Sequence, residues 1–147
     1  MNHNPDGLPE ILPVPASLRA VAQLAQRRQE PLVLMVTLKG CAFCDVVRTN
    51  YLGPMHQRGE VVAAQLNMLD RKTALQDLQG QTTTPHAQAQ AWKVRIAPTV
   101  LFLDAQGREV AERLEGMSSA DFYGAYLQDR IERARRAVRT PSHAPAR

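Results

Sequence analysis

The strongest constraint on the fold of this chain lies at residues 32–38, an apolar run that is followed almost at once by a helical pattern. The run is short, rich in Val and Leu, and does not alternate with polar residues, so it predicts a strand buried on both faces of a sheet. A Lys-Gly pair ends the run. The only two cysteines of the chain, Cys41 and Cys44, then lie at the start of the predicted helix.

This position gives the two cysteines a specific chemistry. The first turn of a helix has unpaired N–H groups and a partial positive charge, so a sulfur at Cys41 is favoured as the thiolate. Cys44 lies three residues further on, on the same side of the helix. The spacing indicates thiol–disulfide exchange, in which Cys41 attacks a disulfide and the more buried Cys44 resolves the mixed disulfide. The motif alone leaves two alternatives, a pair of core cysteines and half of a metal site.

Helical and strand patterns alternate along the rest of the chain. The predicted helices cover residues 17–28, 41–59, 73–78, 84–93 and 118 onward. The predicted strands cover residues 32–38, 61–68, 100–103 and 108–114. Alternating strands and helices imply a parallel part of a sheet, and the final hairpin adds an antiparallel part. The fold class predicted is α/β, with a mixed central sheet, helices on both faces, and a C-terminal β-hairpin plus helix.

Several local details are predicted as well. Gly53-Pro54 is expected to break or kink the helix that starts at Cys41, and residues 81–84 are expected to form a loop. Ser17 is expected to cap the first helix, Thr84 the helix that begins at Pro85, and Ser118 with Asp121 resembles a capping box. The last helix is expected to bury one apolar face, formed by Phe122, Tyr126, Leu127 and Ile131.

Length and composition fit one globular domain with tails. The chain has 147 residues, of which 44% are hydrophobic and 22% charged. We expect an extended leader at 1–15, the domain at 16–137 and a basic tail at 138–147. No apolar run reaches the roughly 18 residues that a membrane span needs. The net charge of +4 owes much to arginines near the C-terminus, which we interpret as a solvated helix end and not a nucleic-acid site. The scattered histidines predict no metal site, and no cofactor is expected.

From about Pro31 to Arg130 the sequence resembles the thioredoxin superfamily. The strand before Cys41, the segment at 64–70 and the segment at 94–99 follow one another in the order of that family. Gly107 and Gly116 fall where the family has its hairpin and groove glycines. The resemblance implies a thioredoxin fold and a protein dithiol–disulfide oxidoreductase whose catalytic residues are Cys41 and Cys44.

The resemblance also implies a substrate site. Pro98 would follow a cis peptide bond and face the cysteines, and the N–H and C=O of Ala97 would pair with an added substrate strand beside Gly116. Phe43 occupies the slot that is aromatic in glutaredoxins and bacterial disulfide isomerases. It is either a contact for apolar substrate segments or a residue packed on the helix flank. The implied partners are protein disulfides or dithiols and an upstream electron donor, and the protein is expected to be a monomer.

The sequence departs from thioredoxin in the core. Met35 and Gln65 stand where thioredoxins bury an Asp–Lys pair, so no internal base for Cys44 is evident, and water or Asp45 is expected to serve. The helix before the strand at 32–38, the long loop at 70–92 and the C-terminal segment together resemble periplasmic thioredoxin-like proteins of bacterial sulfur oxidation and cytochrome maturation. This resemblance implies a periplasmic location, with the cytoplasm as the alternative. Two other functions stay open, a non-catalytic binding module and metal capture by the cysteine pair.

Overall fold

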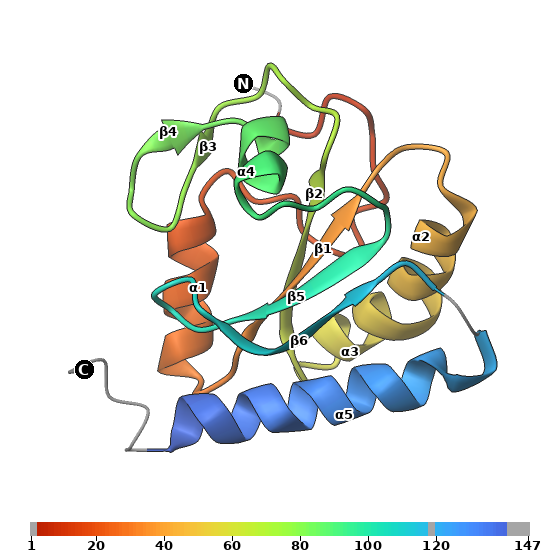
Figure 1. Ribbon diagram of the computed structural model, residues 1–147. Helices are drawn as coiled ribbons and strands as arrows, with labels where there is room; N and C mark the ends of the chain where they lie inside the picture. The colour runs from red at the N-terminus through yellow and green to blue at the C-terminus, as the bar shows by residue number, and fades with distance from the viewer. Residues whose placement is uncertain (1–2, 118–119, 141–147) are drawn as a thin grey trace.

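A mixed four-stranded sheet, covered by helices on both faces, forms the centre of the molecule (Figure 1). The computed structural model describes residues 3–117 and 120–140, and the statements below refer to these. The strands of this sheet, in the order β2-β1-β5-β6, are β2 (Val62–Asn67), β1 (Leu32–Thr37), β5 (Thr99–Leu103) and β6 (Glu109–Glu115). β1 runs parallel to β2, and the other pairings are antiparallel. The fold class predicted from the sequence is confirmed.

Helices divide between the two faces of the sheet. They are α1 (Leu18–Arg27), α2 (Ala42–Val47), the π-helical turn η1 (Arg48–Leu52), α3 (Gly53–Gln57), α4 (Pro85–Ala91) and α5 (Ala120–Arg139). α1 and α4 pack on one face, whereas the helical run from α2 to α3 and helix α5 pack on the other. The expected caps of α1 and α4 are confirmed, because the hydroxyls of Ser17 and Thr84 each accept a hydrogen bond from an N–H in the first turn.

β1 is the most enclosed element of the fold. Every one of its residues is buried, because the strand is paired on both edges and covered on both faces. Alternate side chains enter the two cores: Leu34 packs among the residues beneath α1, and Met35 among those beneath α2 and α5. The apolar run does not alternate with polar residues because β1 has no face in contact with solvent, as the sequence predicts.

The helix that starts after Cys41 does not end at Gly53-Pro54. It continues to Gln57 through η1, where the Gly53 N–H donates to the carbonyl five residues earlier, at Arg48. A proline within a helix lacks the N–H and crowds the carbonyl four residues before it. A single wide turn just ahead of Pro54 accommodates both effects, so the expected disturbance takes the form of a π-helical turn.

The expectation of a helix at 73–78 is wrong. These residues include β3 (Leu75–Gln76), which pairs antiparallel with β4 (Thr82–Thr83), and β4 also replaces part of the loop expected at 81–84. The Asp77 side chain accepts hydrogen bonds from the N–H groups of Gln79 and Gln81. An aspartate that bonds to the following backbone in this way favours a turn over a helix.

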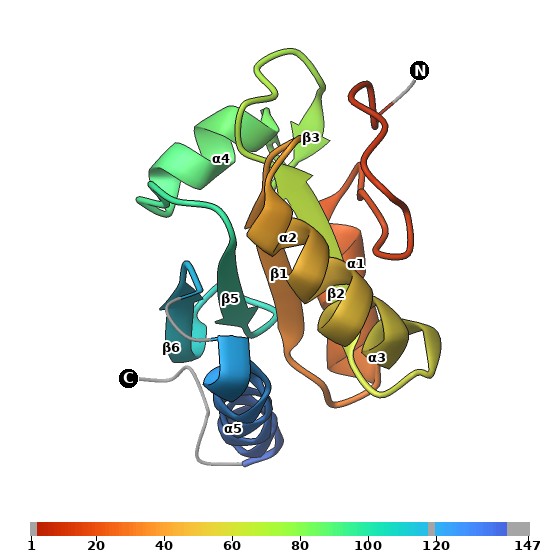
Figure 2. The ribbon, with the colours of Figure 1, turned by 90° about the vertical axis from the view of Figure 1, so that its right-hand side faces the viewer.

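The N-terminal segment, residues 3–15, runs along the outer edge of the sheet, beside β2 (Figure 2). The Gln65 N–H of β2 donates to the Pro13 carbonyl at 2.9 Å. Covering an edge strand in this way blocks pairing with another chain. Three apolar side chains of the segment are buried in the fold, namely Leu8, Leu12 and Val14.

The buried face of α5 includes Leu127 and Ile131, as expected, but not Phe122 and Tyr126. Phe122 and Tyr126 are 59% and 47% exposed, so their predicted burial is wrong. Successive helical residues are about 100° apart, so two neighbouring apolar stripes share the same period, and contact with the sheet selects one of them. The buried stripe is Tyr123, Leu127, Ile131 and Ala134.

Ser118 lies outside the described residues, and α5 extends to Arg139, two residues past the expected end of the domain. None of the described helices is long and apolar enough to cross a membrane.

The two stripes of α5 provide a test of this packing. Leu127→Ala should lower the free energy of unfolding by about 2–5 kcal/mol, because it leaves a cavity against the sheet. Phe122→Ala should change it by no more than about 0.5 kcal/mol, because Phe122 is mostly exposed to solvent. Urea unfolding followed by circular dichroism measures both. Equal losses for the two variants would contradict the orientation of the helix.

Candidate active site

Cys41 and Cys44 form a disulfide at the N-terminus of α2. Cys41 is the N-cap residue, and its Sγ accepts a hydrogen bond from the Cys44 N–H at 3.1 Å. The sulfur thus takes the place of the oxygen of a capping side chain, in a position where the helix favours negative charge. Gly40, with φ of +79°, turns the chain from the end of β1 into this cap.

The two sulfurs differ in their access to solvent. Cys41 is partly exposed, whereas Cys44 is completely buried behind it. Only the first of the two can therefore meet the disulfide of another molecule. When the pair is reduced, Cys41 can attack, and Cys44 remains in reach because the Cα atoms are only 5.2 Å apart.

The segment that leads into β5 forms the second wall of the site. The Ala97–Pro98 peptide bond is cis, and the Ala97 carbonyl oxygen lies 3.8 Å from the Cys41 Sγ. The contact follows from strand register, because β5 is antiparallel to β1 with Thr99 opposite Val36. The start of β5 must then lie beside the end of β1, where the cysteines follow. In the disulfide Cys41 has no proton to give, but its thiol could donate to this oxygen.

Gly116 supports this wall from the end of β6. Its N–H donates to the Pro98 carbonyl at 2.7 Å, and its φ of +70° is a conformation that favours glycine. A Cβ atom added there would lie 2.8 Å from the Ile96 Cδ1. Among the described residues, no backbone group pairs with the N–H or C=O of Ala97, so this short edge is open to another chain.

Two apolar side chains close in sequence to the site are exposed. Phe43, between the cysteines, is 54% exposed, and Ile96, just before Ala97, is 46% exposed. More than half of the surface of Phe43 is therefore accessible to solvent. Both therefore place exposed hydrophobic surface next in sequence to residues of the site, Cys44 and Ala97.

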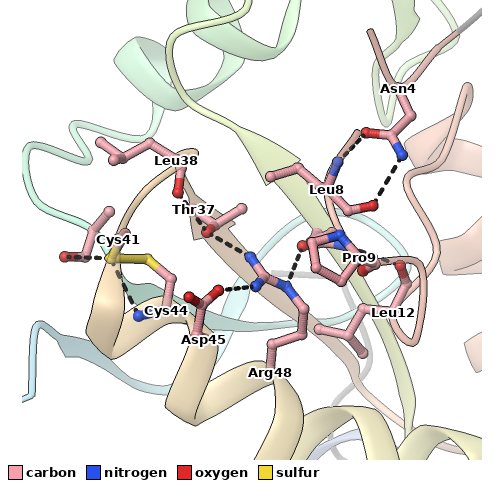
Figure 3. A network of polar contacts seen from close by, with 12 residues as sticks. Asn4, Leu8, Pro9, Leu12, Thr37, Leu38, Cys41, Cys44, Asp45 and Arg48 are labelled. Atoms are coloured by element: carbon pink, nitrogen blue, oxygen red, sulfur yellow. Dashed lines mark hydrogen bonds and ion pairs between the residues drawn. A yellow bond between two sulfur atoms is a disulfide. The ribbon is translucent and has the colours of Figure 1, made fainter. Parts of the chain in front are cut away.

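Arg48 is a member of the site that the sequence analysis missed. Its side chain is 1% exposed and lies beneath α2, where its guanidinium donates to Thr37 and Asp45 (Figure 3) and to Gln65. An arginine is ordinarily a surface residue. A signal was nevertheless present, since Arg48 follows Cys44 by four residues and so lies on the buried face of the helix.

The positions of the missing Asp–Lys pair are neighbours in the sheet. Met35 of β1 is in register with Gln65 of β2. Met35 is part of the apolar core, and the Gln65 amide oxygen accepts a hydrogen bond from Arg48 at 2.9 Å. Asp45, the other group considered as a base, has a side chain that is 66% exposed and pairs with Arg48 at 2.7 Å. Within the described residues, no three His, Cys, Asp or Glu side chains are grouped so that they could hold a metal ion.

The sequence matches the thioredoxin-like domain family over residues 18–131, which is well over half of the chain. The chain belongs to this family. No curated protein matches the sequence. A thioredoxin-like domain with its two cysteines in a disulfide at a helix N-terminus is built for thiol–disulfide exchange.

Solved structures agree on the fold. The thioredoxin of Fasciola hepatica is 18% identical, with a TM-score of 0.54 over 84% of this chain and 99% of that one. A structure described as DsbH oxidoreductase is 13% identical, with a TM-score of 0.54 over 85% and 90%. Oxidised thioredoxin O2 of Arabidopsis thaliana is also 13% identical, with a TM-score of 0.52 over 84% and 97%. At these identities the similarity shows the thioredoxin fold.

Gly116 allows the second wall of the site to be tested. Gly116→Ala should slow the reaction of reduced Cys41 with a peptide disulfide at least severalfold, because the new methyl group displaces Ile96. Gly59→Ala is the matched control: Gly59 has φ of +75° and nothing within 4 Å of its Cβ position. Each variant should lose about 1–2 kcal/mol of stability from backbone strain. Equal rates for the two variants would show that the wall does not contact the peptide.

Proposed function

We propose that this thioredoxin-like protein is an enzyme that reduces or exchanges disulfides in partner proteins. One observation carries the proposal. Cys41 is partly exposed at the N-terminus of α2, with the Cys44 N–H 3.1 Å from its sulfur and the Ala97 carbonyl 3.8 Å away. These contacts provide a stabilised thiolate, a resolving thiol and an open backbone edge at one point on the surface.

The reaction has two steps, each a thiol–disulfide exchange. The Cys41 thiolate attacks one sulfur of the substrate disulfide, that bond breaks, and the other substrate sulfur leaves as a thiolate. The Cys44 thiolate then attacks the Cys41 sulfur, which closes the Cys41–Cys44 disulfide and releases the second substrate thiolate. The leaving thiolates take protons from water. Two electrons pass to the substrate, and an upstream dithiol donor restores the reduced pair. The reverse sequence oxidises a dithiol.

The substrate in this proposal is an extended protein segment that binds a monomer of the enzyme. The N–H and C=O of Ala97 pair with its backbone as an added strand, and Pro98 and Gly116 hold that edge in place. Phe43 and Ile96 contact apolar side chains on either side of the substrate cysteine. Their exposure of 54% and 46% leaves them free to do so. A small disulfide such as oxidised glutathione lacks this segment and should react more slowly.

A trapping experiment tests the proposed reaction. Cys44→Ser removes the resolving thiol, so mixed disulfides with partner proteins should accumulate on Cys41 and disappear on addition of dithiothreitol. Cys41→Ser is the control and should trap no partner, because its remaining thiol is buried. Non-reducing electrophoresis and mass spectrometry identify the adducts. If Cys44→Ser captures no partner protein, and the wild type binds proteins from the same extract without reducing them, the protein is instead a binding module.

We further propose that the protein works in the periplasm. The proposal is supported by the helix before β1, the 70–92 loop and the C-terminal segment, which together resemble periplasmic thioredoxin-like proteins. Fractionation of cells that make the protein at its natural length and level should recover it with periplasmic markers, and its cysteines should be targets of periplasmic redox partners. Recovery with cytoplasmic markers alone would rule this location out.

A further inference from the structure

Arg48 has an unusual environment for a cation. Among the described residues it is the only arginine or lysine that is buried. Each nitrogen of its guanidinium donates one hydrogen bond: Nε to Gln65 at 2.9 Å, Nη1 to Asp45 at 2.7 Å and Nη2 to Thr37 at 3.0 Å. A guanidinium keeps its charge in proteins and has five N–H groups, so two of these remain beyond the three bonds.

The buried charge is only partly balanced. Gln65 and Thr37 are neutral acceptors, and the one carboxylate partner, Asp45, is 66% exposed, so water weakens its pull. Burying a cation is costly, and an apolar side chain of similar length would fill the same space without that cost. The sequence therefore retains a positive charge beneath α2 where packing does not require one.

Cys44 lies one helical turn before Arg48 on the buried side of the helix. Arg48 follows Cys44 by four residues, and both side chains are completely buried, so they lie on the same face of the helix. Helical side chains lean toward the N-terminus, which brings the guanidinium under the turn that holds Cys44. Its bonds to Asp45, the next residue after Cys44, and to Thr37 at the end of β1 agree with that direction (Figure 3).

The N-terminal segment holds this arrangement in place. The Gln65 Nε2 donates to the carbonyl oxygens of Pro9 at 2.7 Å and Leu12 at 2.9 Å. With both amide hydrogens used in this way, the Gln65 oxygen must face Arg48. Residues 3–15 therefore orient the acceptor of the Arg48 Nε and cover the edge of the sheet beside it.

We propose that Arg48 is a positioning residue for Cys44, and that its buried charge stabilises the Cys44 thiolate that resolves the mixed disulfide. The proposal rests on the proposed function, because Cys44 resolves a mixed disulfide only in that reaction. The electrostatic effect of Arg48 on Cys44 can nevertheless be measured without any substrate. The proton of the Cys44 thiol passes to water as the thiolate forms. Of the other charged residues around this site, Asp6, Glu10, Lys39, Asp45, Arg95 and Asp121 are exposed. Asp70, which follows β2, is buried, and Asp129, Arg130 and Arg135 of α5 are partly exposed. Of the titratable neutral side chains, His56 of α3 is partly exposed and Tyr123 of α5 is buried.

A second consequence concerns redox equilibrium. The reduced pair with one thiolate is negatively charged, whereas the disulfide is neutral. A fixed cation beside the pair therefore stabilises the reduced state and makes the protein a stronger oxidant. Replacing Arg48 by a neutral residue should shift the equilibrium with glutathione toward the protein disulfide by up to about tenfold.

Titration of Cys44 as the only thiol tests the proposal. In a Cys41→Ser background, ultraviolet absorbance of the thiolate gives the pH at which half of Cys44 is ionised. Arg48→Met should raise this midpoint by about one pH unit, which is about tenfold less thiolate below it. Arg48→Lys should largely restore the original midpoint, because it returns the charge. Asp45→Asn should lower the midpoint, because it removes the carboxylate that competes for Arg48.

These outcomes separate an electrostatic role from a structural one. A purely structural Arg48 would lower stability in urea without moving the midpoint, and an unchanged midpoint in a folded Arg48→Met protein would overturn the proposal. If Arg48→Met fails to fold, Arg48→Gln replaces it, and an unchanged midpoint in a folded Arg48→Gln protein overturns the proposal. The titration needs no substrate. Failure of the trapping experiment would therefore contradict the proposed function without affecting the measured pKa of Cys44.

Discussion

β1 is hydrogen-bonded along both of its edges, and this pairing sets where the chain turns into the cysteine helix. Parallel pairing with β2 and antiparallel pairing with β5 bury the whole strand. Because β1 ends at Thr37, the chain must leave the sheet there, and Cys41 caps the helix that follows. Because β5 is antiparallel to β1, its first residues lie at that same end. The meeting of Ala97 with Cys41 is thus a result of strand register, and no separate interaction has to bring them together.

Local signals in the sequence were sufficient for much of this arrangement. Ser17 and Thr84 carry their own capping oxygens, and the run at 32–38 has the composition of a strand without a solvent face, so these elements could be predicted. The expected helix at 73–78 was wrong because the turn made by Asp77 prevails over a weak helical pattern. Leu127 and Ile131 of α5 were assigned correctly, but Phe122 and Tyr126 were not, because two apolar stripes have the same period and only packing against the sheet distinguishes Tyr123 from Phe122.

The role of Arg48 lay beyond such local reasoning. Its burial requires acceptors from three separate parts of the chain, Thr37 of β1, Asp45 of α2 and Gln65 of β2. The orientation of Gln65 depends in turn on the carbonyls of a segment more than fifty residues earlier. A sequence pattern records none of these distances. The replacement of the expected Asp–Lys pair by Met35 and Gln65 could be seen in the sequence, but the burial of Arg48 against Gln65 could not.

In our proposal, the thiolates of the two cysteines are stabilised by two different sources of positive potential. Cys41 depends on the helix N-terminus, which supplies the Cys44 N–H and leaves the sulfur in contact with solvent. Cys44 receives no such help, because it is buried and its own N–H is already directed at Cys41. In our proposal the cation beneath the helix fills that gap, since a buried thiol needs a nearby charge to ionise. A partly exposed nucleophile activated by the backbone and a buried resolving thiol activated by a side chain can then be tuned separately.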